Sequence, residues 1–272
     1  MEEERSPLVR MVLLAAVIVG AGSGAWYVLQ KPAPKAPPPT VAPAPTEPAT
    51  APGPTAPHYP VEAITPPPTR DVATPLPDLF DSDRYVLEAL NALVAHPQLA
   101  QWLVPEHLIQ RFVAFVDALP NRKVATNLWP AKPASERFFV QEDGAATVIG
   151  PANSARYDAQ VTALTGVDTQ AAVTLYLRLY PLLQQAYRDL GYPDRHFNDR
   201  FVAVLDHLLA APEPAPPLAV QRDDKGNWVY VDGDLESASA GQKFLMRLGA
   251  THEAAVKAKL RELRTALAAA QP

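Results

Sequence analysis

Charged side chains of the kind that bind metals or anions are concentrated in YPLLQQAYRDLGYPDRHFNDRFVAVLDHLL, residues 180–209. At 100° per residue, five of them fall on one arc of a helix predicted over residues 195–210, opposite its apolar side chains. These five are the candidate binding residues: His196, Asp199, Arg200, Asp206 and His207. The same arc is typical of the solvated face of an amphipathic helix, and we favour that interpretation over a ligand site.

The spacing of these residues argues against a metal site. Asp199 and Asp206 are two turns apart, about 10 Å along a helix, so one ion would not reach both carboxylates. His196 and Asp199 have a chelating spacing of three residues, but two ligands are too few for a stable site. We therefore predict no metal at this helix, and no cofactor is expected elsewhere in the chain.

Three further polar residues are predicted to have structural roles. Asn198 points to the apolar side of its helix, where an amide without partners would cost about 1 to 3 kcal/mol. We expect Asn198 to clamp the preceding loop. Ser239 and Gln242 have the spacing of a capping box, in which each side chain bonds the backbone amide of the other residue. The glycine and lysine nearby are not adjacent, as a phosphate-binding loop would require.

The sequence contains no recognised catalytic arrangement. Its serines occur in neither GxSxG nor SxxK, and there is no cysteine to act as a nucleophile. A pair of carboxylates for glycoside cleavage stays open, because such pairs meet in space and not in sequence. We therefore name no catalytic residue.

Two long helices must position the candidate residues. Asp168 can cap a helix that runs to Leu190, with Gly191 as its terminator, and the helix over residues 195–210 follows. Three tyrosines lie on the apolar stripe of the first helix: Tyr176, Tyr180 and Tyr187. We expect these rings to pack in the core, and a sugar-stacking platform is the alternative.

The remaining pattern predicts a mainly α fold with two short β-hairpins. Apolar residues at three-and-four spacing predict helices that begin near Ser82 and Pro105. Apolar runs around Asp143-Gly144 and around a turn containing Gly226 predict the hairpins. A last helix, with Glu253 near its start to suit the helix dipole, has one apolar stripe: Val256, Leu260, Leu263 and Leu267.

The amino terminus predicts a membrane anchor. Residues 11–30 carry no charge and are about long enough to cross a ~30 Å hydrocarbon core as one helix; a cleaved signal peptide is the alternative. Gly20 and Gly24 form a GxxxG pair that could bring two such helices together as a homodimer. Basic residues flank both ends of the span equally. We favour a cytoplasmic tail over residues 1–10 and the rest of the chain outside.

Composition divides the chain after this span into two parts. Of the 31 prolines in the chain, most fall within residues 31–78, which predicts an extended, disordered linker there. Residues 79–272 remain as one mostly helical globular domain, large enough to bury a core without disulfides. The net charge of −5 at pH 7 argues against nucleic acid as a partner, because phosphate binding needs a clustered positive surface.

Four runs in this order carry a resemblance: NSARYD, LYPLLQQAYRDLGYP, FNDRFVAVLDHLL and LESASAGQKFLMRLG. The chain resembles an uncharacterised proteobacterial family of membrane-anchored proteins with a periplasmic domain of unknown function, over nearly all of residues 79–272. The resemblance implies a single-pass protein of the bacterial inner membrane, anchored by residues 11–30, whose C-terminal domain lies in the periplasm. It carries no activity, ligand or catalytic residue to this chain.

Two functions stay open on this reasoning. We favour a non-enzymatic binding or scaffolding protein of the cell envelope, which the linker holds off the membrane to meet an envelope protein or a cell-wall partner. The alternative is a cell-wall hydrolase or lytic enzyme that uses an unidentified carboxylate pair. A cleft with two carboxyl groups about 5 to 10 Å apart would favour the hydrolase. An apolar patch of several hundred Å² would favour the partner site.

Overall fold

The computed structural model of the chain describes three ranges: residues 56–64, 75–134 and 137–268. The membrane span predicted over residues 11–30, with Gly20 and Gly24, lies outside these ranges, as does most of the predicted linker. Within the described ranges, no helix combines the length and the apolar character needed to span a membrane.

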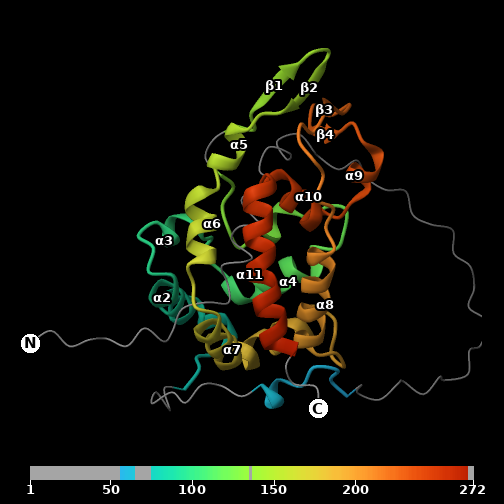
Figure 1. The fold of residues 1–272 in the computed structure, drawn as a ribbon. Helices are drawn as coiled ribbons and strands as arrows, with labels where there is room; N and C mark the ends of the chain where they lie inside the picture. Colours follow the sequence, from blue (N-terminus) through green and yellow to red (C-terminus); the bar gives the residue numbers. More distant parts are fainter. Residues whose placement is uncertain (1–55, 65–74, 135–136, 269–272) are drawn as a thin grey trace, which may run out of the picture.

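The described residues form ten α-helices and two hairpins, so the predicted mainly α class is confirmed for this part of the chain (Figure 1). The helices are α2 (Asp83–Val94), α3 (Leu99–Trp102), α4 (Leu108–Ala118), α5 (Ala152–Ala155), α6 (Asp158–Thr165), α7 (Thr169–Asp189), α8 (Phe197–Leu209), α9 (Gly233–Ser237), α10 (Ala240–Arg247) and α11 (Ala250–Ala268). Short 3-10 turns lie at Val61–Ala63, Leu79–Asp81 and Thr126–Leu128.

The ends of α7 follow the local signals in its sequence. The Asp168 carboxylate accepts a hydrogen bond from the Ala171 amide at 2.8 Å, which satisfies one of the amides that a helix leaves open at its start. Gly191 follows the last turn with φ 113°, a conformation that residues with a Cβ avoid. The predicted start and stop of this helix are both confirmed.

Aromatic rings join α4, α7 and α8 in the main core. Phe112 of α4 lies 6.1 Å and 5.9 Å, between ring centroids, from Phe197 and Phe201 of α8. Tyr176 of α7 lies 5.6 Å from Phe201, and Tyr187 lies 5.6 Å from Phe197. Both tyrosines are buried, which confirms that they pack in the core.

α11 packs against α6, α7 and α8. Its predicted apolar stripe is buried: Val256, Leu260, Leu263 and Leu267. Gly249 separates α10 from α11 with φ 86°, and a Cβ at this position would collide with the Ser154 hydroxyl. Glycine is therefore required there for both conformation and space.

α4 begins later than the sequence predicts, and its first turn is capped by a residue of another helix. The helix begins at Leu108, not in the turn after Pro105. The Asp83 carboxylate of α2 accepts hydrogen bonds from the amides of His107, at 2.7 Å, and Leu108, at 2.8 Å. Ser82, near which α2 was expected to begin, is its N-cap residue but makes no side-chain capping bond. A cap supplied by another helix cannot be predicted from the spacing of residues near the start of α4.

Both predicted hairpins are present as two-stranded antiparallel sheets. Their strands are β1 (Val140–Asp143) with β2 (Ala146–Ile149), and β3 (Val220–Arg222) with β4 (Trp228–Tyr230). Figure 1 shows the two hairpins together at one end of the helical body. We name them the hairpin lobe, residues 139–150 and 218–231. A small core separate from the main one joins the second hairpin to α10: Val220, Tyr230 and Met246.

An N-terminal strap, residues 56–64, lies against the body although the sequence assigned it to the linker. Ile64 is buried in the main core, and Tyr59 and Val61 pack against that core. The folded body therefore includes part of the range 31–78 that was expected to be a linker. In Figure 1 the strap lies at the end of the body opposite the hairpins.

Candidate functional site

Asp199, in the first turn of α8, holds the strap. Its two carboxylate oxygens accept hydrogen bonds from the backbone amides of His58, at 3.0 Å, and Tyr59, at 2.7 Å. Hydrogen bonds to a charged acceptor are roughly twice as strong as neutral ones. Both oxygens of Asp199 thus bind the chain's own N-terminal segment. Neither the interpretation as a solvated face nor that as a ligand site predicted this contact.

Asn198 is fully buried between α7, α8 and the strap. The Tyr176 hydroxyl donates to its side-chain oxygen at 3.0 Å, and its side-chain nitrogen donates to the Tyr59 carbonyl at 2.8 Å. Burial, followed by the proximity of Tyr180 and Asp199, raises the pKa of Tyr176 well above its usual value. Tyr176 therefore stays protonated and keeps its role as donor.

The loop before α8 is clamped by Gln184 of α7 and not, as expected, by Asn198. The Gln184 side-chain nitrogen donates to the Arg195 carbonyl at 2.8 Å. Its side-chain oxygen accepts from the Phe197 amide and from the Tyr180 hydroxyl, both at 2.9 Å. The expectation for Asn198 was wrong because the side chain turns away from the loop, toward a strap far away in sequence.

Arg200 and Asp206 join α8 to two other helices. The Arg200 Nε lies 2.7 Å from an Asp117 carboxylate oxygen of α4, and an Nη2 donates to the Asp117 carbonyl at 2.6 Å. Asp206 accepts two hydrogen bonds from Arg264 of α11, at 2.8 Å and 3.1 Å. Asp206 is exposed and Arg200 half-buried, as the solvated face of a helix predicts, but neighbouring helices also supply a charged partner for each.

His207 belongs to the start of α10. Its Nε2 lies 2.8 Å from the Ser239 hydroxyl oxygen. Burial, with a smaller contribution from the Arg200 charge, lowers the pKa of His207. Ser239 and Gln242 form the predicted capping box, and the Gln242 side-chain nitrogen also donates to the His207 carbonyl at 3.0 Å. The capping box therefore fixes α10 against α8 as well as capping it.

The five candidate residues do not converge on one pocket. Four of them contact four different partners, and we name these four the α8 seam: Asp199, Arg200, Asp206 and His207. His196 precedes α8 as its N-cap residue and makes no side-chain capping bond. Among the residues that the structure describes, no group of three or more histidine, cysteine or acidic side chains could hold a metal ion. The seam therefore holds helices and strap together.

A buried lysine in α11 was missed by the sequence reasoning. Lys257 is 1% exposed, and its Nζ lies 2.6 Å from the Ala211 carbonyl, 3.0 Å from Glu253 and 2.8 Å from Glu213. Burial raises the pKa of Glu253, whereas the hydrogen bond from Lys257 lowers that of the exposed Glu213. Glu253 lies three residues before Val256, and Lys257 lies four after Glu253 and three before Leu260, so the signal was present in the sequence.

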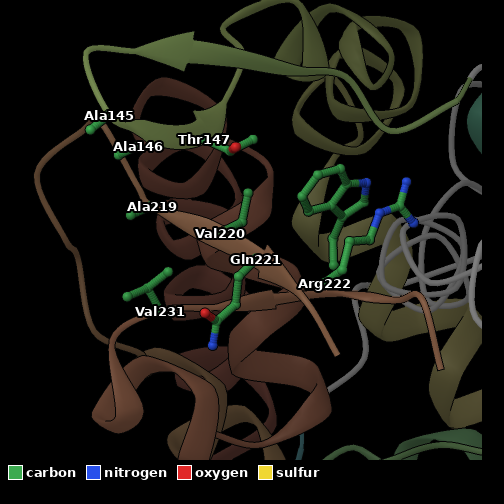
Figure 2. A pocket seen from close by; sticks show the side chains of 9 residues that line it. Ala145, Ala146, Thr147, Ala219, Val220, Gln221, Arg222 and Val231 are labelled. Atoms are coloured by element: carbon green, nitrogen blue, oxygen red, sulfur yellow. The ribbon is translucent and has the colours of Figure 1, made fainter. Parts of the chain in front are cut away.

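The two hairpins meet along β2 and β3 and border a cleft of about 500 Å³ (Figure 2). A single bridge, between Val148 and Ala219, joins the strands, and the Ile149 amide donates to the Leu218 carbonyl at 2.9 Å. Nine residues of the two hairpins line the cleft: Ala145, Ala146 and Thr147 of the first, and Ala219, Val220, Gln221, Arg222, Trp228 and Val231 of the second.

The lining of this cleft is suited to binding. It contains no carboxylate and no histidine, so none of the described residues there could transfer a proton at neutral pH. Arg222 is its one charged residue, with the guanidinium carbon 4.1 Å from the Trp228 ring centroid. The sequence predicted each hairpin but not the cleft, because β2 and β3 are far apart in the chain and only the fold brings them together.

Comparison with known proteins places most of the described body in one protein family. The sequence model of a family described as "Protein of unknown function (DUF3014)" matches residues 108–264. These residues run from α4 into α11 and include α8 and both hairpins, whereas the strap and α2 precede them. No curated protein and no solved structure matches the chain.

Proposed function

We propose that this chain, which belongs to the DUF3014 family of proteins of unknown function, is a non-enzymatic binding or scaffolding protein of the bacterial cell envelope. We place its binding site in the cleft of the hairpin lobe. The observation that carries this proposal is the lining of the cleft. Alanine, valine, threonine, glutamine and tryptophan side chains and one arginine border a concave site of a size usual for ligand pockets.

The same lining counts against the hydrolase alternative. Glycoside cleavage needs two carboxyl groups about 5 to 10 Å apart across the bond that is broken. The lining of the cleft contains no carboxyl group, and its one charged residue is Arg222. We therefore favour recognition of a partner over cleavage of a polymer.

The arrangement of the body supports a tethered role. The strap joins the body at the N-terminal end of α8, and the hairpin lobe lies at the other end (Figure 1). We propose that residues 11–30 anchor the chain in the inner membrane with the body in the periplasm. Attachment at the strap end would then turn the cleft away from the membrane, toward envelope proteins.

The proposal of a binding site is tested by crosslinking in cells. A photoreactive amino acid replaces Gln221, in the wall of the cleft, or Glu88, an exposed residue of α2 that serves as control. We expect a distinct partner protein to crosslink at position 221 and not at position 88. Deleting residues 32–55, which spares the strap, should weaken that crosslink. An identical set of adducts from both positions would refute the site.

The proposed location is tested by labelling. The chain has no cysteine, so Lys225→Cys at the exposed tip of the second hairpin introduces a single thiol. A membrane-impermeant maleimide should label this variant in intact spheroplasts. Labelling only after lysis would place the body in the cytoplasm and overturn the periplasmic location.

A further inference from the structure

The strap is the place where the N-terminal part of the chain first meets the body. Residues 1–55 precede it, and the described body resumes at residue 75. A pull on residue 55 therefore reaches the body through the contacts of the strap before it reaches residue 75. How firmly the strap is held thus decides the point at which the body is attached to an anchor that precedes it.

The polar contacts of the strap are concentrated on two adjacent residues. The amides of His58 and Tyr59 donate to Asp199 at 3.0 Å and 2.7 Å, and the Tyr59 carbonyl accepts from Asn198 at 2.8 Å. Asp199 and Asn198 are themselves neighbours in the first turn of α8. These three hydrogen bonds are therefore made or lost together when this part of the strap lifts from α8.

The apolar contacts of the strap are limited as well. Ile64 is buried, whereas Tyr59 and Val61 are half-buried and pack against the main core from outside. A hydrogen bond to Asp206 and, with a smaller effect, one to Tyr59 raise the pKa of Arg264 in α11, so the strap also reaches that helix. A segment held by such a small set of contacts opens at a lower free energy than the one at which a whole domain unfolds.

Opening the strap would leave its partners on α8 satisfied. Asp199 is half-buried, so its carboxylate meets water once the two amides leave. Asn198 keeps the hydrogen bond from the Tyr176 hydroxyl at 3.0 Å, and its side-chain nitrogen, which points to the strap, becomes accessible to water. Opening therefore avoids the costly outcome of a buried polar group without a partner, and the strap can detach and return while α8 stays folded.

We propose that the strap is a reversible latch, closed on α8 without load and opened by tension on the tether, residues 31–55. This inference rests on the proposed function, in which residues 11–30 anchor the chain and the cleft holds a partner. The closed latch keeps the strap end of the body toward the anchor. When it opens, residues 56–74 join the tether and, at ~3.4 Å per residue, add up to about 65 Å of reach. A bound partner that moves away from the membrane then stays bound.

The first experiment measures opening without tension, in the full-length chain in detergent micelles. The chain has no cysteine, so Ile64→Cys places a single thiol under the strap, and Val202→Cys places one in the main core, where both native residues are buried. We expect a maleimide to label position 64 at least tenfold faster than position 202, because the strap opens without unfolding of the body. Asp199→Ala should accelerate labelling at position 64 by about a further tenfold and leave position 202 unchanged. Asp194→Ala, an exposed aspartate in the loop before α8, removes the same charge and should accelerate neither.

The second experiment applies tension and retains the native Ile64. Handles for optical tweezers are attached to Thr50→Cys, before the strap, and to Gln185→Cys, at an exposed position of α7. A reversible lengthening of up to about 65 Å should precede the unfolding of the body. Asp199→Ala should shift this first step to lower force, and Asp194→Ala should not.

Three results would overturn the latch: equal labelling at positions 64 and 202, loss of strap and body in one step under tension, or a first step that Asp199→Ala leaves unchanged. Failure of the latch is distinguishable from failure of the proposed function. A partner that crosslinks at position 221 in cells would keep the cleft as a binding site after any of these three results. Conversely, loss of that crosslink with rapid labelling at position 64 would remove the proposed partner site and keep the opening of the strap.

Discussion

Asn198, Glu253 and Lys257 are buried in the helical body, and each has polar partners there. In the hairpin lobe, Thr147 and Arg222 face an open cleft. The two regions also differ in their cores, since the body gathers aromatic rings from three helices, whereas the core under the lobe consists of Val220 and Tyr230 packed on Met246 of α10. A buried polar group without a partner costs about 1 to 3 kcal/mol, so the body tolerates little change, and the exposed edges of the lobe tolerate more.

The difference indicates that stability and the proposed binding depend on different regions of the molecule. Interactions that hold the fold lie along the α8 seam and α11, and the binding site that we propose lies in the lobe. Stability and binding should therefore respond to different substitutions. Paired substitutions in the body and the lobe can measure this difference.

The largest effect is expected in the aromatic core. Phe197→Ala should lower the free energy of unfolding by about 3 to 5 kcal/mol, because it leaves a cavity between α4, α7 and α8. The same change at Phe139 of the lobe, which is 49% exposed, should cost about 1 kcal/mol or less. Urea unfolding of both variants measures the contrast. Equal losses would show that the lobe is as essential to the fold as the body.

The second largest loss of stability is expected at the buried Lys257. Lys257→Ala should destabilise the body by about 3 kcal/mol, since it leaves Glu253 without its cation. Replacing both partners, as Lys257→Met with Glu253→Leu, should recover most of the loss because no buried charge remains. Thermal unfolding of the single and double variants checks this. A double variant as unstable as the single one would refute the charge explanation.

The cost of Lys257→Ala should also depend on pH. Burial raises the folded-state pKa of Glu253 above its usual value of 4.5, and without Lys257 nothing offsets that shift. The folded state then binds more protons than the unfolded state above pH 4.5, so stability falls as the pH rises through this window. Unfolding measured between pH 4 and 7 should show a loss that grows toward neutral pH. A loss that does not change with pH would contradict this account.

The strap should show a moderate effect. Asp199→Ala removes both acceptors that hold His58 and Tyr59 and should cost about 1 to 2 kcal/mol. Limited proteolysis should cut near residues 56–64 faster in this variant than in wild type, whereas the rest of the body stays resistant. Asp224→Ala, at an exposed position in the second hairpin turn, is the control. Unchanged cleavage at the strap would show that other contacts dominate its attachment.

The smallest effect on stability, and the sharpest on binding, is expected at Arg222. Arg222→Glu should change the free energy of unfolding by about 0.5 kcal/mol or less, because the side chain is exposed. It should nevertheless abolish the crosslink formed at position 221 in cells. A variant that is strongly destabilised, or one that crosslinks as wild type does, would contradict the claim that stability depends on the body and binding on the lobe.

Local patterns predicted much of the fold. The cap at Asp168, the glycine stop at Gly191, the capping box at Ser239 and both hairpins depend on residues within a few positions of each other. The long helices were found for the same reason, because an apolar stripe repeats every three or four residues. The start of α4 was missed because Asp83, which holds it, belongs to another helix.

The candidate site was harder to predict for the same reason. The polar arc of α8 was correctly located, yet Asp117, Arg264 and the strap, which pair with it, lie far away in the chain. A helical projection separates apolar from polar faces but does not say whether the polar face meets water or another charge. The cleft required two hairpins to meet, and no local signal encodes that meeting.

What the sequence by itself determined is the set of elements and their ends, because propensity, capping and apolar period act over one or two turns. Only the tertiary structure decided which polar side chains meet each other and which remain exposed. The physical reason is that pairing and burial depend on distance in space: Asn198 meets Tyr59 across 139 positions of the chain, and Thr147 and Val220, from different hairpins, line one cleft.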